Sequence, residues 1–176
     1  MTALLEIGSA RTGPVHPSAV TMDVAGAADH QAVWGVDPIP LPDNSVGEIY
    51  TSHTLEHVPW FNTIAALKEA LRVLRPGGLI EIWVPNFAYI VECYQKGECG
   101  DKWRKFNRHG DPVTWVNGRI FTYGPDEANW HRAVFDEGHL TRCLTQAGFT
   151  DIKRLPKRTR GQRHGPIDMG MTGRKS

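Results

Sequence analysis

Residues suited to ligand binding stand where predicted strands end. An apolar run at residues 3–7 stops at Gly8, and the next predicted strand, residues 19–23, stops at Asp23. A glycine at the carboxyl end of a strand lets a ligand approach the backbone closely, and open α/β sheets bind ligands at that edge. A carboxylate beside the turn can hydrogen-bond to the hydroxyls of a ribose. Together the two residues suggest a nucleoside site. Taken alone, Gly8 is interpreted as a structural turn, and Asp23 is interpreted equally well as a ribose contact or as a solvated loop acid.

Alternating apolar and amphipathic segments must position these residues. Short apolar runs separated by stretches of helical periodicity are typical of helices packed on a mostly parallel sheet. Strands are predicted at residues 3–7, 19–23, 32–36, 46–52, 79–84, 152–155 and 167–172. One helix is predicted over residues 60–74, and a second begins after the capping residue Asp136 and ends at Gly148. The sequence therefore predicts an α/β protein.

The segment from residue 86 to residue 135 has a different character. It is rich in Trp, Tyr, Asn, Gly and His and shows little periodicity. Long irregular segments inside a compact domain are usually functional. We expect this segment to be irregular and to line or cover the site, within a single domain of residues 1–176.

Composition and charge exclude several classes of protein. The formal net charge of +1 argues against a nucleic-acid coat or a polybasic membrane protein, and 40% hydrophobic residues exclude a disordered chain. No stretch approaches the ~20 apolar residues of a membrane span, and we expect no export leader from the first residues of the sequence. The three cysteines are sparse, so a reduced, cytoplasmic protein is expected, with a Cys93–Cys99 disulfide as the less favoured alternative. No Cys/His pair has zinc-finger spacing, and no metal site is predicted.

Four short motifs, taken in their order along the chain, are its most specific sequence features. They are IPLPDNSV at residues 39–46, SHTLEHV at 52–58, LRVLRPGG at 71–78 and VPN at 84–86. In this order and spacing the sequence closely resembles the class I S-adenosylmethionine-dependent methyltransferases, in particular a small bacterial branch (methyltransferase type 11) associated with polysaccharide biosynthesis. The resemblance covers nearly the whole chain. It implies a Rossmann-like three-layer α/β sandwich whose mostly parallel sheet has a terminal antiparallel strand.

The resemblance also implies which residues hold the cofactor. Seven residues would contact S-adenosylmethionine: Glu6, Gly8 and Ser9 around the methionine part, Asp23 at the ribose, Asp37 or the backbone next to it at the adenine, and Ser52 and His53 beneath the cofactor. This cofactor carries no phosphate, which agrees with the absence of a Walker-type lysine from the sequence. One departure concerns Pro14 and Pro17, which leave no room for the helix usual between the first two strands.

Histidines are the candidates for acid–base chemistry. A general base is needed only when the acceptor loses a proton during attack, as a sugar hydroxyl does. His53 would lie nearest the transferred methyl group, with a structural, backbone-bonded role as an equal alternative. His131 is interpreted as a base, as a substrate contact or, equally, as a loop-packing residue. His57 is interpreted as structural.

Aromatic and basic residues are the candidates for acceptor binding. Tyr123 and Trp130, together with Trp103 and Trp115, are placed to stack on a sugar or aromatic acceptor, or else form a small core of their own. The basic run at residues 153–164 is interpreted as a solvated connection between strands. Binding of an anionic substrate or of nucleic acid by this run is the less favoured interpretation.

The resemblance implies an enzyme that transfers the methyl group of S-adenosylmethionine to a small-molecule or glycan acceptor, with a sugar hydroxyl as the first expectation. Two alternatives stay open from the sequence. One is a non-catalytic, methyltransferase-like partner subunit, and the other is a nucleic-acid methyltransferase. A homodimer is a further expectation, because a short chain can use a neighbouring copy to close its site.

Overall fold

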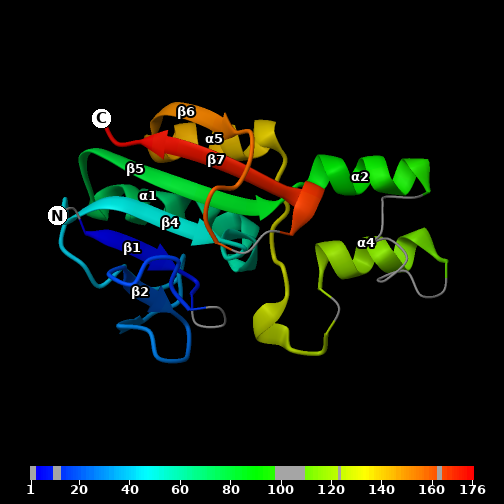
Figure 1. The fold of residues 1–176 in the computed structure, drawn as a ribbon, viewed down its shortest axis with the longest axis horizontal. Coiled ribbons are helices and arrows are strands. Elements are labelled where there is room, and N and C mark those ends of the chain that lie inside the picture. Colours follow the sequence, from blue (N-terminus) through cyan, green and yellow to red (C-terminus); the bar gives the residue numbers. More distant parts are fainter. Residues whose placement is uncertain (1–2, 10–12, 98–109, 123, 162–163) are drawn as a thin grey trace.

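A seven-stranded sheet organises the chain in the computed structural model, which describes residues 3–9, 13–97, 110–122, 124–161 and 164–176 (Figure 1). The strand order is β3-β2-β1-β4-β5-β7-β6. The strands are β1 (Leu4–Ile7), β2 (Val20–Asp23), β3 (His30–Gln31), β4 (Val46–Ser52), β5 (Leu74–Pro85), β6 (Thr150–Leu155) and β7 (Asp168–Arg174). The first five strands pair in parallel, and β7 is antiparallel to both of its neighbours. The predicted α/β class, with a mostly parallel sheet and a terminal antiparallel strand, is confirmed.

Helices α1 (Thr63–Val73) and α5 (Glu137–Ala147) pack against one another on one face of the sheet. Figure 1 shows both of them behind the strands. Their apolar stripes meet alternate residues of β5, including Ile80 and Ile82, and this layer forms the main core. Asp136 caps α5 by accepting a hydrogen bond from the His139 backbone nitrogen at 2.6 Å, and Gly148 ends the helix at φ +105°, both as predicted.

The opposite face of the sheet is covered in part by the connection between β6 and β7. Tyr50 and Trp83 lie buried on this face, with the guanidinium of Arg160 4.6 Å from the Tyr50 ring and that of Arg158 4.7 Å from the Trp83 ring. Arg160 also pairs with a carboxylate oxygen of Glu81 at 2.7 Å. The interpretation of this basic run as a solvated connection is therefore wrong for Arg158 and Arg160, because both arginines pack on buried aromatic rings.

The segment between β5 and α5 is more regular than the sequence indicates. Helices α2 (Phe87–Lys96) and α4 (Pro112–Ile120) lie together beyond the end of the sheet (Figure 1). The prediction of an irregular segment is wrong for these residues. Short 3-10 turns complete the chain: η1 (Leu55–His57), η2 (Trp60–Asn62), η3 (Glu127–Asn129) and η4 (Gly165–Ile167).

Two other predicted elements are displaced. The strand predicted at residues 32–36 is a turn, and β3 precedes it as a two-residue strand. Trp60 to Asn62, predicted as the start of a helix, form the 3-10 turn η2 before α1. Among the described residues between β1 and β2 there is no helix, as Pro14 and Pro17 predict.

Cys93 is disulfide-bonded, so the expectation of reduced cysteines is wrong at this position, and Cys143 is a buried thiol. Within the described ranges, no helix is both long and apolar enough to cross a membrane.

Candidate active site

The carboxyl ends of β1 and β2 bring Gly8 and Asp23 side by side. The Gly8 nitrogen donates to the Met22 carbonyl at 2.9 Å, one residue before Asp23. Gly8 has φ +90°, and a Cβ at this position would stand 1.9 Å from the hydroxyl oxygen of Thr54. The glycine is thus required both by its backbone conformation and by the close approach of Thr54. The Asp23 carboxylate stays at this edge and accepts a hydrogen bond from the Val24 nitrogen at 2.7 Å.

The remaining residues assigned to the cofactor at this edge also order its loops. Glu6 is buried and accepts a hydrogen bond from the Val15 nitrogen at 2.7 Å, which ties the β1–β2 loop to the sheet. Burial raises the pKa of Glu6, and the hydrogen bond from Val15 offsets part of this rise. Ser9 is buried in the turn after β1. Asp37 accepts from the Val33 nitrogen at 2.8 Å and so closes the turn that follows β3.

His53 follows Ser52, the last residue of β4, and is held between two carboxylates. Its Nε2 lies 2.8 Å from Oδ1 of Asp168, and its Nδ1 lies 3.2 Å from Oε1 of Glu56. Burial acts to lower the pKa of His53, but the hydrogen bond with Asp168, the contact with Glu56 and the charges of both acids outweigh it and raise the pKa to about 9. The imidazole is therefore protonated at neutral pH and cannot accept a proton. This geometry does not favour His53 as a base, and we propose that His53 is a positioning residue.

Glu56 lies at the centre of a group of histidines. Its side chain is only 1% exposed, and its carboxylate stands among His53, His57 and His131. Burial acts to raise the pKa of Glu56, but its contact with His53 and the charges of the three histidines lower it. Glu56 is therefore ionised. Its backbone carbonyl also accepts from the Arg132 nitrogen at 2.7 Å, which fixes the chain next to His131.

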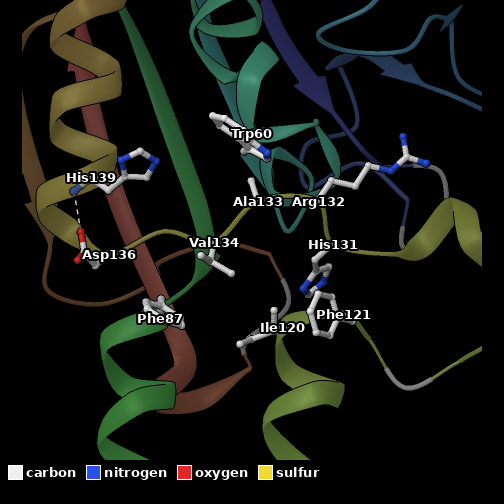
Figure 2. Close-up of a pocket in the computed structure, with 10 residues that line it drawn as sticks. All are labelled: Trp60, Phe87, Ile120, Phe121, His131, Arg132, Ala133, Val134, Asp136 and His139. Carbon is white, nitrogen blue, oxygen red and sulfur yellow. Dashed lines mark hydrogen bonds between the residues drawn. The ribbon is translucent and has the colours of Figure 1, made fainter.

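His131 lies in the wall of a cavity of about 480 Å³ beyond the carboxyl ends of β4 and β5 (Figure 2). Burial lowers the pKa of His131, with the negative charge of Glu56 acting in the opposite direction. The ring is thus neutral at pH 7 and retains an electron pair. The cavity is lined by Trp60, Phe87, Ile120, Phe121, His131, Arg132, Ala133, Val134, Asp136 and His139. Most of these side chains are apolar, so the cavity favours an acceptor with an apolar face.

The predicted aromatic wall is only partly present. Trp115 is buried in a small core with Ile90 and Ile167, which is the alternative that the sequence left open for it. Trp130 is partly exposed, and its indole nitrogen donates to the Gly124 carbonyl at 3.1 Å. Tyr123 and Trp103 lie outside the described residues. Trp60 and Phe121, which the sequence analysis did not single out, line the cavity instead.

The family described as "Methyltransferase domain" matches residues 4–154. The chain belongs to this family. It is 30% identical over 158 residues to a demethylmenaquinone methyltransferase of Staphylococcus saprophyticus, in a match that covers 85% of this chain and 57% of that protein. The chain thus spans about half the length of the curated relatives it matches.

Solved structures give the same fold. A possible histamine N-methyltransferase of Thermotoga maritima aligns with the whole methyltransferase chain and 83% of its own, at a TM-score of 0.60 and 18% identity. An S-adenosylmethionine-dependent methyltransferase of Archaeoglobus fulgidus aligns with 99% of this chain and 86% of its own, at a TM-score of 0.62 and 15% identity. The cofactor that family and fold imply is S-adenosylmethionine, as the sequence resemblance also implies.

The edge formed by β1, β2 and β4 presents residues of the kinds that such a cofactor needs. Asp23 stands beside the Gly8 turn, where an acid can meet ribose hydroxyls, and Ser52 ends the next strand. The residues that sequence reasoning missed are Glu56 and Asp168. A signal for Glu56 is present, because an acid lies between two histidines in SHTLEHV, whereas nothing in the sequence points to Asp168.

Proposed function

We propose that this methyltransferase methylates a hydroxyl oxygen of a small acceptor bound in the cavity beside His131, with a sugar hydroxyl as the first candidate. The observation that carries the proposal is the position of His131, a neutral histidine in the wall of a largely apolar cavity. Aromatic side chains such as Trp60 and Phe121 offer flat faces to a ring, whether of a sugar or of an aromatic compound.

S-adenosylmethionine supplies an electrophilic methyl group on a positively charged sulfur. In the proposed site Asp23 holds the ribose, and Glu6, Gly8 and Ser9 shape the turn around the methionine part. Trp60 and Phe121 orient the acceptor so that its hydroxyl lies next to the methyl group, and such positioning supplies much of the rate. As the new oxygen–carbon bond forms and the carbon–sulfur bond breaks, His131 takes the hydroxyl proton on its ring nitrogen.

A second candidate acceptor is an aromatic ring of the quinone type. It is favoured by the names of the curated relatives, which are demethylmenaquinone methyltransferases, and by the apolar lining of the cavity. The nucleic-acid alternative loses support, because Arg158 and Arg160 of the basic run pack on buried rings of the sheet and Arg160 pairs with acids there.

The proposal is tested with purified protein, S-adenosylmethionine carrying a labelled methyl group, and two acceptor panels, one of nucleotide sugars and glycosides and one of demethylmenaquinone analogues. Transfer of label to a hydroxyl oxygen of the first panel is the expected result. His131→Ala should lower kcat/KM by about 100-fold or more, as loss of a general base does. His16→Ala, which changes a histidine outside the cavity lining, is the matched control. Transfer of the labelled methyl group only to the second panel would show that the acceptor is a quinone-type ring and not a sugar. Undiminished activity of His131→Ala would show that His131 is not the general base.

A further inference from the structure

We propose that Glu56, His57 and His131 form a binding site for one divalent transition-metal ion. One possible ligand atom from each of the three residues lies within 4.8 Å of the other two. The rings of His57 and His131 meet edge to face, with centroids 5.0 Å apart. Two imidazoles and one carboxylate are a donor set that suits Zn²⁺ and related transition-metal ions, with coordination positions left for other ligands.

The Glu56 carboxylate is the first reason to infer an ion. Buried carboxylates are normally satisfied by several donors, because an ionised carboxylate has about four lone-pair directions. Within the described part of the chain, neither oxygen of Glu56 receives an aligned hydrogen bond, and its contact with His53 is an ion pair at 3.2 Å that reaches Oε1 only. Oε2 is therefore a buried anionic oxygen with no protein partner among the described residues.

The hydrogen bonds of the two histidines are the second reason. The Nδ1 of His57 donates to the Trp130 carbonyl at 3.2 Å, and the ring of His131 donates to the backbone of Arg119. Each ring is thus oriented through one nitrogen, and the other nitrogen is available to an ion. Histidines that bind metals almost always have this arrangement, in which a backbone carbonyl or carboxylate holds the second ring nitrogen.

Small side-chain rotations complete the geometry. Ligand atoms at about 2.1 Å from Zn²⁺ stand about 3.4 Å apart in a tetrahedron, so the group in the structure is at most somewhat wider than a bound site. His57 ends the short turn η1. His131 precedes Arg132, whose backbone nitrogen donates a hydrogen bond to the Glu56 carbonyl. These hydrogen bonds hold the three residues together without an ion.

The open side of the proposed site faces the acceptor, because His131 also lines the cavity. A Lewis-acidic ion there would orient the acceptor hydroxyl and lower its pKa. The oxygen–methyl bond then forms while the carbon–sulfur bond breaks with its electron pair left on sulfur, and the hydroxyl proton passes to solvent water. In this case His131 serves as a ligand and not as the base. This role of the ion rests on the proposed function, whereas binding of the ion does not.

Ion binding is measured without any methyl transfer. Chelator-treated protein is titrated with Zn²⁺ by calorimetry and with Mn²⁺ by electron paramagnetic resonance, and one ion per chain with micromolar or tighter affinity is expected. Glu56→Gln and His131→Ala should each weaken binding at least tenfold. His139→Ala is the matched control, since His139 lines the same cavity but lies outside the group of three, and its affinity should equal that of the parent.

Absence of stoichiometric binding by folded protein, or equal affinity of His131→Ala and the parent, would overturn the proposal. Near-ultraviolet circular dichroism checks that each variant is folded, and His131→Ala carries the test if Glu56→Gln does not fold. Full activity in the presence of chelator, with ion binding established, would overturn the role of the ion and leave His131 as the base. Ion binding without transfer to any hydroxyl would overturn the proposed function alone.

Discussion

His53 and Asp168 join two distant parts of the chain: the imidazole Nε2 lies 2.8 Å from the carboxylate Oδ1, across 115 residues of sequence. Asp168 opens β7, and His53 follows β4, with β5 between them in the sheet. Asp168 also accepts from the His164 nitrogen at 2.8 Å, so one carboxylate fixes both the histidine and the end of the β6–β7 connection. The pair positions the loop that carries Glu56 and His57.

The charge on His53 makes stability depend on pH. The pKa of His53 is raised to about 9 from its ordinary value of 6.5, because Asp168 and Glu56 outweigh the effect of burial. Protonated His53 therefore stabilises the fold fully below about pH 6.5, and this contribution is lost as the pH rises through 9. We expect a loss on the order of 3 kcal/mol in the free energy of unfolding between these limits.

Urea unfolding of chelator-treated protein at several pH values measures this loss. In Asp168→Asn the His53 ring should titrate closer to its ordinary range, which proton NMR of the ring follows directly. Asp151→Asn is the control, since this exposed acid pairs with Lys153 and not with His53. A His53 ring that titrates near its ordinary pKa of 6.5 in the parent protein would contradict the arrangement.

Gly8 should tolerate no side chain. A Cβ at Gly8 would meet Thr54 at 1.9 Å, and its φ of +90° adds backbone strain, so Gly8→Ala is expected to lower the free energy of unfolding by about 3 kcal/mol or more. Gly77→Ala is the matched control, because Gly77 has φ +75° but an added Cβ there would meet nothing within 4 Å, and its cost should be about 1 kcal/mol. Equal costs for the two variants, measured by urea unfolding, would show that the contact with Thr54 is not tight.

Trp60 and Phe61 are adjacent, similarly exposed aromatic residues with different surroundings. Their relative exposures are 71% and 69%, but only Trp60 lines the cavity. Trp60→Ala is expected to raise the acceptor KM by about tenfold, as loss of one aromatic contact of about 1 kcal/mol or more would do. Phe61→Ala should leave KM unchanged, and both variants should unfold within about 0.5 kcal/mol of the parent. Steady-state kinetics that showed the same KM for both variants would place the acceptor elsewhere.

Arg160 is the principal partner of two acids on the sheet face away from α1 and α5. It pairs with Glu48 and with Glu81, so Arg160→Met should leave their charges uncompensated and lower the free energy of unfolding by about 2 kcal/mol. Arg154→Met removes a pair with Glu137 in which both side chains are well exposed, and its effect should stay within about 0.5 kcal/mol. Comparable effects of the two variants in urea unfolding would mean that Arg160 is not an internal residue of the fold.

Elements with strong local signals were predictable. β4 occupies residues 46–52 as predicted, and α5 lies between the cap Asp136 and Gly148. α4 was missed although its signal is present, since Asp111 caps the helix and Pro112 occupies its first position. β3 was misplaced because the apolar run after it forms a turn held by Asp37. The apolar content of the run does not reveal this turn.

The candidate site was predictable where one strand end supplies it and not where distant segments meet. Gly8 and Asp23 were found because each ends a recognisable strand. The group around Glu56 escaped prediction because His131 lies 74 residues after His57 and comes from a segment without periodicity. No spacing rule for metal ligands covers such a separation, and for this reason the sequence predicted no metal site.

A cofactor site at the ends of β1 and β2 is measurable by calorimetric titration with S-adenosylmethionine and with S-adenosylhomocysteine. We expect micromolar binding of both compounds by the parent protein and at least tenfold weaker binding by Asp23→Ala, with Asp43→Ala as a control on an exposed acid outside the site. Folded parent protein that binds neither compound, or an Asp23→Ala variant that binds both as tightly as the parent, would contradict this expectation.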